Sequence, residues 1–290
     1  MIAKFTAALL LIGTVLPIQL RATTVVVLVS KNGIVVSTDS KRTLHRPTDL
    51  AMVGEGRQDK FVIFQNKFVV AYVGYAEFAV GPNRYDALRF LQDLKPRIHG
   101  NISIDDLAGF IESEGTATFA ALSINDALKS GAINNKDHRV PCEPFAHFVI
   151  AGYQDGQPRV YLVEYDVDWN SKGIVGPTKR LLYPDPAVHY NVAIMRFGMV
   201  EAIIDVLDRR SYAHHQAVLS VPKTIAALDA NQIPSLDETV ALGHCLIQIE
   251  ETTNPTDIGG AVKSAKVSTD GHAEVVADIK HKSVNTTSKP

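Results

Sequence analysis

The chain has 290 residues, of which 46% are hydrophobic and 21% are charged, and its formal net charge is −2. This is typical of a globular protein with one large domain or two small ones. Because basic and acidic residues nearly balance, we expect no nucleic-acid partner and no general attraction to anionic membranes. With only Cys142 and Cys245, a disulfide framework or four-cysteine metal site is excluded, and one bridge between them stays open.

The N-terminus has the layout of a secretory signal peptide. Residues 1–4 carry a positive charge, residues 5–20 are apolar, and Leu20-Arg21-Ala22 places a small residue just before Thr23. This pattern predicts a signal peptide over residues 1–22 and an exported protein, periplasmic or secreted. The alternative is an uncleaved leader that anchors the chain, and this would be its only expected membrane contact, because no later run is apolar enough to span a bilayer.

Two strand pairs follow the leader. Residues 24–29 and 34–38 are rich in β-branched residues, and the Asn-Gly step between them is a strong hairpin signal. Residues 60–64 and 68–73 form a second pair around a short polar turn. The segment between the pairs, residues 44–59, is polar and contains two glycines, so we predict a loop there.

Helical patterns come next. Tyr85, Leu88, Leu91 and Leu94 recur at helical spacing, and Lys95-Pro96 predicts the end of that helix. Residues 103–106 resemble a capping box that opens a second amphipathic helix. A third strand pair, residues 145–153 and 159–167, turns at an Asp-Gly step.

The last third predicts helices and then strands. Residues 168–185 predict a loop and residues 186–210 a helical block, and Ser235 caps a helix that runs to about residue 251. Residues 261–267 and 273–279 predict the final strands. Helices that arrive in groups between strand pairs favour antiparallel sheets covered by helix layers, an α+β fold. We predict a domain over residues 23–280 and a disordered tail over 281–290.

A threonine at a newly cut N-terminus could carry chemistry. Its hydroxyl needs a base, and the free α-amine of the same residue, with a pKa of about 7.7–8.0, can accept the proton. Asp39 ends the second strand, so the hairpin returns it to the sheet edge where Thr23 begins. Lys60 begins the third strand and could assist that amine. Gly74 ends the fourth strand, and its amide could stabilise an oxyanion.

The same residues also have simpler interpretations. Thr23 and Thr24 could be strand formers, Asp39 a turn residue, Lys60 a solvated strand start and Gly74 a plain strand-end glycine. His214-His215 and the His244-Cys245 step lack a second ligand pair at metal spacing, so we expect them to be structural or solvent-facing. We predict no metal and no cofactor.

The segment TTVVVLVSKNGIVVSTDSKRT, residues 23–43, resembles the start of a mature proteasome β-type subunit, an N-terminal-nucleophile (Ntn) hydrolase. Counted from Thr23, Gly33 and Asp39 fall at that family's spacing without a gap. One five-residue insertion within residues 44–59 brings the family's catalytic lysine to Lys60 and its cleft glycine to Gly74. FVIAGYQDG (148–156) and DIGGAVKSAKV (257–267) resemble the family's central strand and the glycine step before its last strands.

The resemblance implies a four-layer αββα sandwich and a threonine-type hydrolase of peptide or other amide bonds. Thr23 would be the nucleophile, Asp39 would orient Lys60, and the Gly74 amide would contribute to the oxyanion hole. Asp257 is the suggested counterpart of the aspartate near the terminal amine, although Ile258 stands where a serine is usual. Substrate-lining residues implied by the resemblance are Arg42, Thr43, Tyr72, Ala76 and Val80.

The relatives form rings, so the resemblance makes a homo-oligomer an open expectation. A rival hypothesis retains the Ntn fold but gives the protein no catalytic activity. In that case an uncleaved leader would hold a non-catalytic Ntn-fold protein whose sheets serve in binding or assembly.

Overall fold

The structure is a computed structural model that describes residues 23–45, 52–75, 77–80, 83–131, 141–184, 191–255 and 258–276. The predicted signal peptide and tail lie outside the described residues, as do Ala76 and Asp257. Those predictions therefore stay predictions.

The first sheet contains the predicted N-terminal hairpin at its centre. Its five antiparallel strands have the order β12 (Val192–Gly198), β1 (Thr24–Ser30), β2 (Gly33–Thr38), β13 (Lys263–Val267) and β14 (Ala273–Val276). Ser30 pairs with Gly33 across the β1–β2 turn, which confirms the hairpin. The final strand pair is confirmed as β13 and β14.

The second sheet is also five-stranded and antiparallel. Its order is β11 (Gly173–Tyr183), β10 (Gln157–Asp168), β9 (Cys142–Gln154), β6 (Phe68–Gly74) and β5 (Phe61–Phe64). The β5–β6 and β9–β10 hairpins confirm the second and third predicted pairs. β6 and β9 then join these two hairpins into one sheet.

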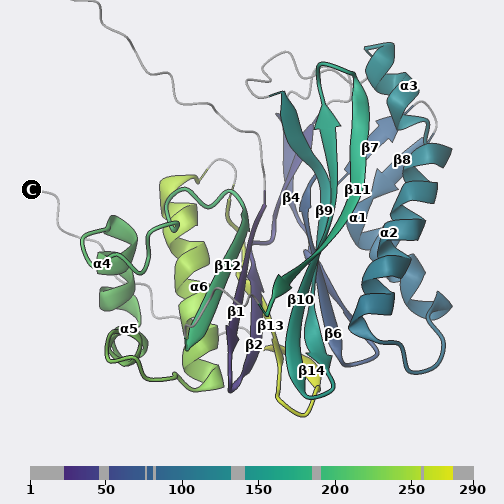
Figure 1. Ribbon diagram of the computed structural model, residues 1–290. Helices are drawn as coiled ribbons and strands as arrows, with labels where there is room; N and C mark the ends of the chain where they lie inside the picture. Colours follow the sequence, from purple (N-terminus) through teal and green to yellow (C-terminus); the bar gives the residue numbers. More distant parts are fainter. Residues whose placement is uncertain are drawn as a thin grey trace, which may run out of the picture.

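Helices cover the outer face of each sheet (Figure 1). The second sheet is covered by α1 (Ala87–Leu94), which continues into a 3-10 turn at Lys95–Arg97, and by α2 (Ile104–Ala121) and α3 (Ile124–Lys129). The first is covered by α4 (Tyr212–Ser220), α5 (Pro222–Asp229) and α6 (Leu236–Thr253). The predicted α+β, four-layer αββα architecture is therefore confirmed. Within the described residues, no helix is both long and apolar enough to cross a membrane.

The predicted helix starts at Ser103 and Ser235 are confirmed by their hydrogen bonds. The Ser103 hydroxyl accepts from the Asp106 amide at 3.0 Å, and Ser235 and Glu238 form a reciprocal capping box. These contacts satisfy backbone amides that have no partner within the first helical turn.

Three sequence predictions were wrong. Residues 44–59 are not a plain loop, because β3 (Lys41–His45) pairs with β4 (Met52–Arg57) in a separate two-stranded ribbon. Such a ribbon does not need the apolar alternation that marks a core strand. A second small ribbon, β7 (Glu77–Val80) with β8 (Asn83–Asp86), was also not predicted.

The other two errors concern the edges of the large sheets. Residues 168–185 contain the edge strand β11, where Val175 and Leu181 are 50% and 42% exposed, so its sequence lacks a buried strand's pattern. Residues 186–210 do not form a helical block, because they contain β12 and a run of turns. A short apolar run such as that of β12 cannot be assigned by periodicity alone.

Candidate functional site

Thr23 and Thr24 lie in different environments. Successive side chains of a strand point to opposite faces of the sheet. In β1, Val25 and Val27 pack between the two sheets, whereas Val26 packs towards α6 and its neighbours. Continuing this alternation places Thr23 on the inter-sheet side and Thr24 on the helix side. The Thr24 hydroxyl accordingly donates to the Met199 carbonyl at 2.6 Å.

A buried ion pair adjoins Thr23. The Lys60 Nζ lies 2.9 Å from Asp39 Oδ1 and 2.8 Å from Oδ2, and both residues are 1% exposed. The Thr24 amide also donates to Asp39 Oδ1, at 2.9 Å. The carboxylate is therefore fixed by the strand that begins at Thr24 and by the lysine that precedes β5.

Burial sets the electrostatics of this pair. Removal from water raises the pKa of Asp39, while Lys60 and backbone amides of Thr24 and Gly259 act in the opposite direction. Burial likewise lowers the pKa of Lys60, and the attraction of Asp39 partly offsets it. A titratable pair whose pKa values are shifted by burial and by one specific partner is a feature found at functional sites.

Thr23 itself is 1% exposed and is held through its backbone. Its carbonyl accepts from the Met199 amide at 3.1 Å, and a β-carbon at Gly198 would collide with that carbonyl oxygen. The same hypothetical β-carbon would lie 3.2 Å from a methyl of Val73. Gly198 therefore lets β12 pass closely between Thr23 and the end of β6, where Val73 and Gly74 lie.

Gly74 occupies a position that requires glycine. Its φ is +103°, and a β-carbon there would lie 2.5 Å from the Phe145 carbonyl oxygen. Its place at the end of β6, next to Val73, agrees with the predicted location. The direction of its amide towards an oxyanion stays a prediction.

The other predicted site residues divide into three groups. Tyr72 is 1% exposed in the core beneath α1 and α2, and its hydroxyl donates to the Asp59 carbonyl at 3.1 Å. It lies on the opposite face of β6 from Val73, so we place it in the core rather than in the inter-sheet cleft. Arg42 and Thr43 are in β3 and Val80 is in β7, but their side chains lie outside the described residues. Ala76 and Asp257 lie outside them entirely.

The Gly-Gly step also contacts the site. The Gly259 carbonyl accepts from the amides of Ser40 and Lys41 at 3.2 and 2.8 Å, directly after Asp39. Ile258 is fully buried beside it. Sequence reasoning identified this step but missed Gly198 and Met199, because it assigned their segment to a helix. The sequence signal that could have predicted this strand is the run of β-compatible residues that ends in Phe197-Gly198.

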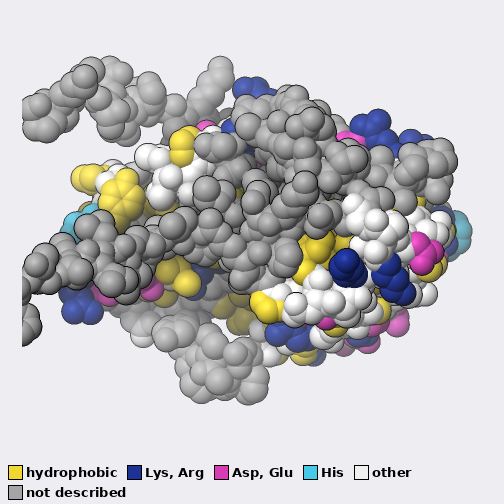
Figure 2. All heavy atoms as spheres, turned by 90° about the horizontal axis from the view of Figure 1, so that it is seen from above, with side chains coloured by type: hydrophobic (Ala, Val, Ile, Leu, Met, Phe, Trp, Pro, Cys, Tyr) yellow, Lys and Arg dark blue, Asp and Glu magenta, His cyan; other side chains and the backbone are white. Residues whose placement is uncertain are grey.

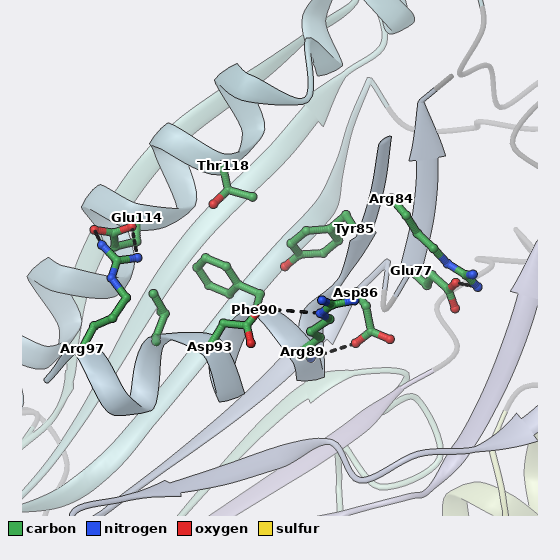
Figure 3. A pocket seen from close by; sticks show the side chains of 11 residues that line it. Glu77, Arg84, Tyr85, Asp86, Arg89, Phe90, Asp93, Arg97, Glu114 and Thr118 are labelled. Carbon is green, nitrogen blue, oxygen red and sulfur yellow. Dashed lines mark hydrogen bonds and ion pairs between the residues drawn. The ribbon is translucent and has the colours of Figure 1, made fainter. Parts of the chain in front are cut away.

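Two cavities differ in their position, since one adjoins the Gly-Gly step beside Asp39 and the other is remote from it. One of about 350 Å³ is lined by Lys41, Arg57, Glu251 and residues 258–260. The other, of about 700 Å³, lies on the far side of the second sheet, among α1, α2 and the β7–β8 ribbon (Figure 3). Its charged lining is already paired internally, since Arg97 holds Glu114 and Arg84 holds Glu77.

Within the described ranges, no three His, Cys, Asp or Glu side chains gather as metal ligands. His214 and His244 are buried, and His215 is exposed. Cys142 is exposed and Cys245 is buried, both as free thiols, so the open possibility of a bridge between them is not realised.

No family model matches the chain, and no curated protein matches it. The solved structure of an Anbu mutant from Hyphomicrobium sp. strain MC1 is similar, with 11% sequence identity and a TM-score of 0.41. That similarity covers 89% of this chain and 87% of the other. At this level it transfers no residue roles, so the site rests on this chain's own geometry.

Proposed function

We propose that the protein is an exported threonine-type Ntn hydrolase that cleaves peptide or other amide bonds through an acyl-enzyme on Thr23. The observation that carries this proposal is the buried Asp39–Lys60 pair, tied to the Thr24 amide directly after Thr23. Burying two charges destabilises a fold, because the packing of neighbouring side chains does not compensate for the hydration that the charges lose. An ion pair that is buried beside an inward-facing threonine is explained if it serves catalysis by that threonine.

The mechanism requires removal of residues 1–22. The freed Thr23 amine accepts the hydroxyl proton as Oγ1 attacks the substrate carbonyl, and a tetrahedral intermediate forms. The Lys60 ammonium, held by Asp39, favours the developing alkoxide and keeps the amine neutral. The Gly74 amide is the proposed donor to the oxyanion. The carbon–nitrogen bond then breaks, and the leaving amine takes the proton.

Water completes the cycle. It attacks the Thr23 ester, gives a proton to the α-amine and releases the carboxylic acid with regeneration of the hydroxyl. Each step needs only groups of the protein, the substrate and water. The ring-forming habit of the resembled family makes a homo-oligomer part of the proposal, to be tested by the mass of the native particle.

The direct test compares Thr23→Ala with the unsubstituted protein on a panel of short peptide amides. We expect hydrolysis and ester formation on the protein to be lost, and the thermal unfolding midpoint to stay nearly unchanged, because a single hydroxyl is removed. Thr24→Val is the matched control, since Thr24 faces the helices, and it should retain activity. Hydrolysis that survives in Thr23→Ala would assign the chemistry to another nucleophile.

The rival is a non-catalytic protein that keeps its leader. The environment of Thr23 provides one reason to test it, because Thr23 is 1% exposed and its described backbone partner Met199 is apolar and buried. In that case no peptide amide would be cleaved by the exported protein. The Asp39–Lys60 pair would then hold the sheet ends together and nothing more.

A further inference from the structure

The inter-sheet face of the second sheet changes from apolar to charged as it approaches Thr23. In the middle of β9, Val149 and Ala151 face the first sheet and are at most 1% exposed. The same alternation, continued along β9 and β10, places His147, Glu164 and Asp166 on this face. The side chains of His147, Asp166 and Glu164 are 12%, 32% and 15% exposed, so this end of the face is open to solvent whereas its middle is sealed.

His147 is connected to Thr23 by a short series of neighbours. The Thr23 carbonyl lies against Gly198, and Gly198 lies against Val73. The register between β6 and β9 pairs Val73 with His147, and side chains paired in this way have β-carbons about 4.5–5.5 Å apart. Figure 1 shows β9, β10 and β11 continuing past the end of β1 and β2. The wall beyond Thr23 is therefore made by the second sheet.

A histidine–aspartate pair occupies this wall. His147 Nε2 lies 2.7 Å from Asp166 Oδ1, and the two side chains are 12% and 32% exposed. Among the described residues, His147 is the hydrogen-bond partner of this carboxylate, through one oxygen, while the Arg180 guanidinium attracts it without a hydrogen bond. The Asp166 side chain stays 32% exposed to solvent. Glu164, by contrast, is held by Arg180 through two hydrogen bonds of 2.6 and 2.8 Å. Asp166 is thus the carboxylate on this wall that an arriving cation can engage.

We propose that the His147–Asp166 pair is a specificity site that binds a positively charged group of the substrate, such as a lysine-like or arginine-like side chain of a peptide amide. This inference rests on the proposed function for Thr23. Asp166 supplies the carboxylate, and His147 is a positioning residue that fixes its orientation. Hydrogen bonds between a guanidinium and a carboxylate are short, strong and directional, so one oriented carboxylate is sufficient for preference.

The surroundings favour a cation over an anion. Burial raises the pKa of the nearby Cys142 thiol, and the negative charges of Asp166, Asp168 and Glu143 raise it further. Carboxylates therefore gather at this end of β9 and β10, where Arg180 is the cation that interacts with Glu164 and Asp166. Figure 2 shows Lys, Arg, Asp and Glu side chains interspersed over the described surface seen from above.

The test separates this inference from the proposed catalysis by measuring binding without turnover. Calorimetry on the Thr23→Ala protein would use three acylated peptide amides that differ only in one residue, arginine, leucine or glutamate. We expect the arginine amide to bind about 10-fold more tightly than the leucine amide, and the glutamate amide to bind most weakly. Asp166→Asn should remove this order, and Glu164→Gln, the matched control, should keep it.

His147→Asn then tests the positioning role. It should weaken the preference for arginine over leucine while leaving the affinity for the leucine amide unchanged, which general damage to the fold would not do. Equal affinities for the three amides, or an arginine preference that survives Asp166→Asn, would overturn the inference. Turnover of the same amides by the unsubstituted protein tests Thr23 separately. Selective binding without hydrolysis would reject the catalytic proposal and keep the specificity site.

Discussion

The space between the two sheets has two ends that bury chemically different groups. At the hairpin end, Val29 and Ile34 belong to the same inter-sheet core as Val149 and Ala151 of the other sheet, and all four are at most 1% exposed. At the Thr23 end, Asp39 and Lys60 are just as buried, but they form an ion pair. Burial therefore does not distinguish core from site in this molecule, whereas the kind of group that is buried does.

The two ends also differ in what they contribute to stability. Apolar side chains at the hairpin end stabilise the fold by leaving water. The two charged groups lose hydration on burial, and the attraction between them compensates for only part of that free-energy loss. Substitutions at each end should therefore separate folding from activity, and the following variants test this from the largest expected effect to the smallest.

The largest effect should come from breaking the ion pair. Asp39→Ala leaves the Lys60 ammonium buried without its carboxylate, which we expect to lower the free energy of unfolding by about 3–5 kcal/mol. Amide hydrolysis should be lost at the same time. Chemical denaturation measures the first effect and turnover of a peptide amide measures the second.

The double variant Asp39→Leu with Lys60→Met sharpens that result. Replacing a buried pair by apolar residues of similar size is often neutral or stabilising. We expect unfolding free energy near that of the unsubstituted protein and no hydrolysis. A double variant that is as destabilised as Asp39→Ala would show that the pair serves the fold, which contradicts the contrast between the two ends.

The hairpin end should respond in the opposite way. Ile34→Ala removes a fully buried side chain from the inter-sheet core, and we expect a loss of about 2–5 kcal/mol in unfolding free energy. The fraction that remains folded should hydrolyse amides normally, because the substitution is at the far end of β2 from Asp39. A large fall in turnover per folded molecule would show that the two ends are coupled.

The smallest effect should come from Thr24→Val. This change removes the hydrogen bond to the Met199 carbonyl and should cost about 1 kcal/mol. Activity should persist, because the hydroxyl points away from the cleft. Loss of hydrolysis in this variant, with Thr23 intact, would mean that the assignment of the two threonines is reversed.

Much of the fold was predictable because its central strands have clear local signals. The Asn-Gly turn and the valine runs predicted β1 and β2, and the capping residues predicted the starts of α2 and α6. The sixteen-residue step from Thr23 to Asp39, together with the resemblance, led to Lys60. The ion pair that the structure shows confirms that Asp39 and Lys60 meet.

The remainder depended on contacts that sequence does not show. β12 is a short apolar run that only its pairing with β1 identifies as a strand, so Gly198 and Met199 were missed. Asp166 meets His147 as a diagonal neighbour, since the β9–β10 register pairs His147 with Glu164, two residues before Asp166. Tyr72 was expected near substrate, but the alternation of β6 directs it into the helix-covered core.

The central claim is that Thr23 becomes an N-terminal nucleophile, and one mass measurement tests it most directly. The exported protein would be treated with an acylating β-lactone, digested, and its N-terminal peptide sequenced by tandem mass spectrometry. We predict a chain that begins at Thr23 and carries the acyl group on that threonine. A chain that begins at Met1 or at another residue, or an acyl group elsewhere, would contradict the account.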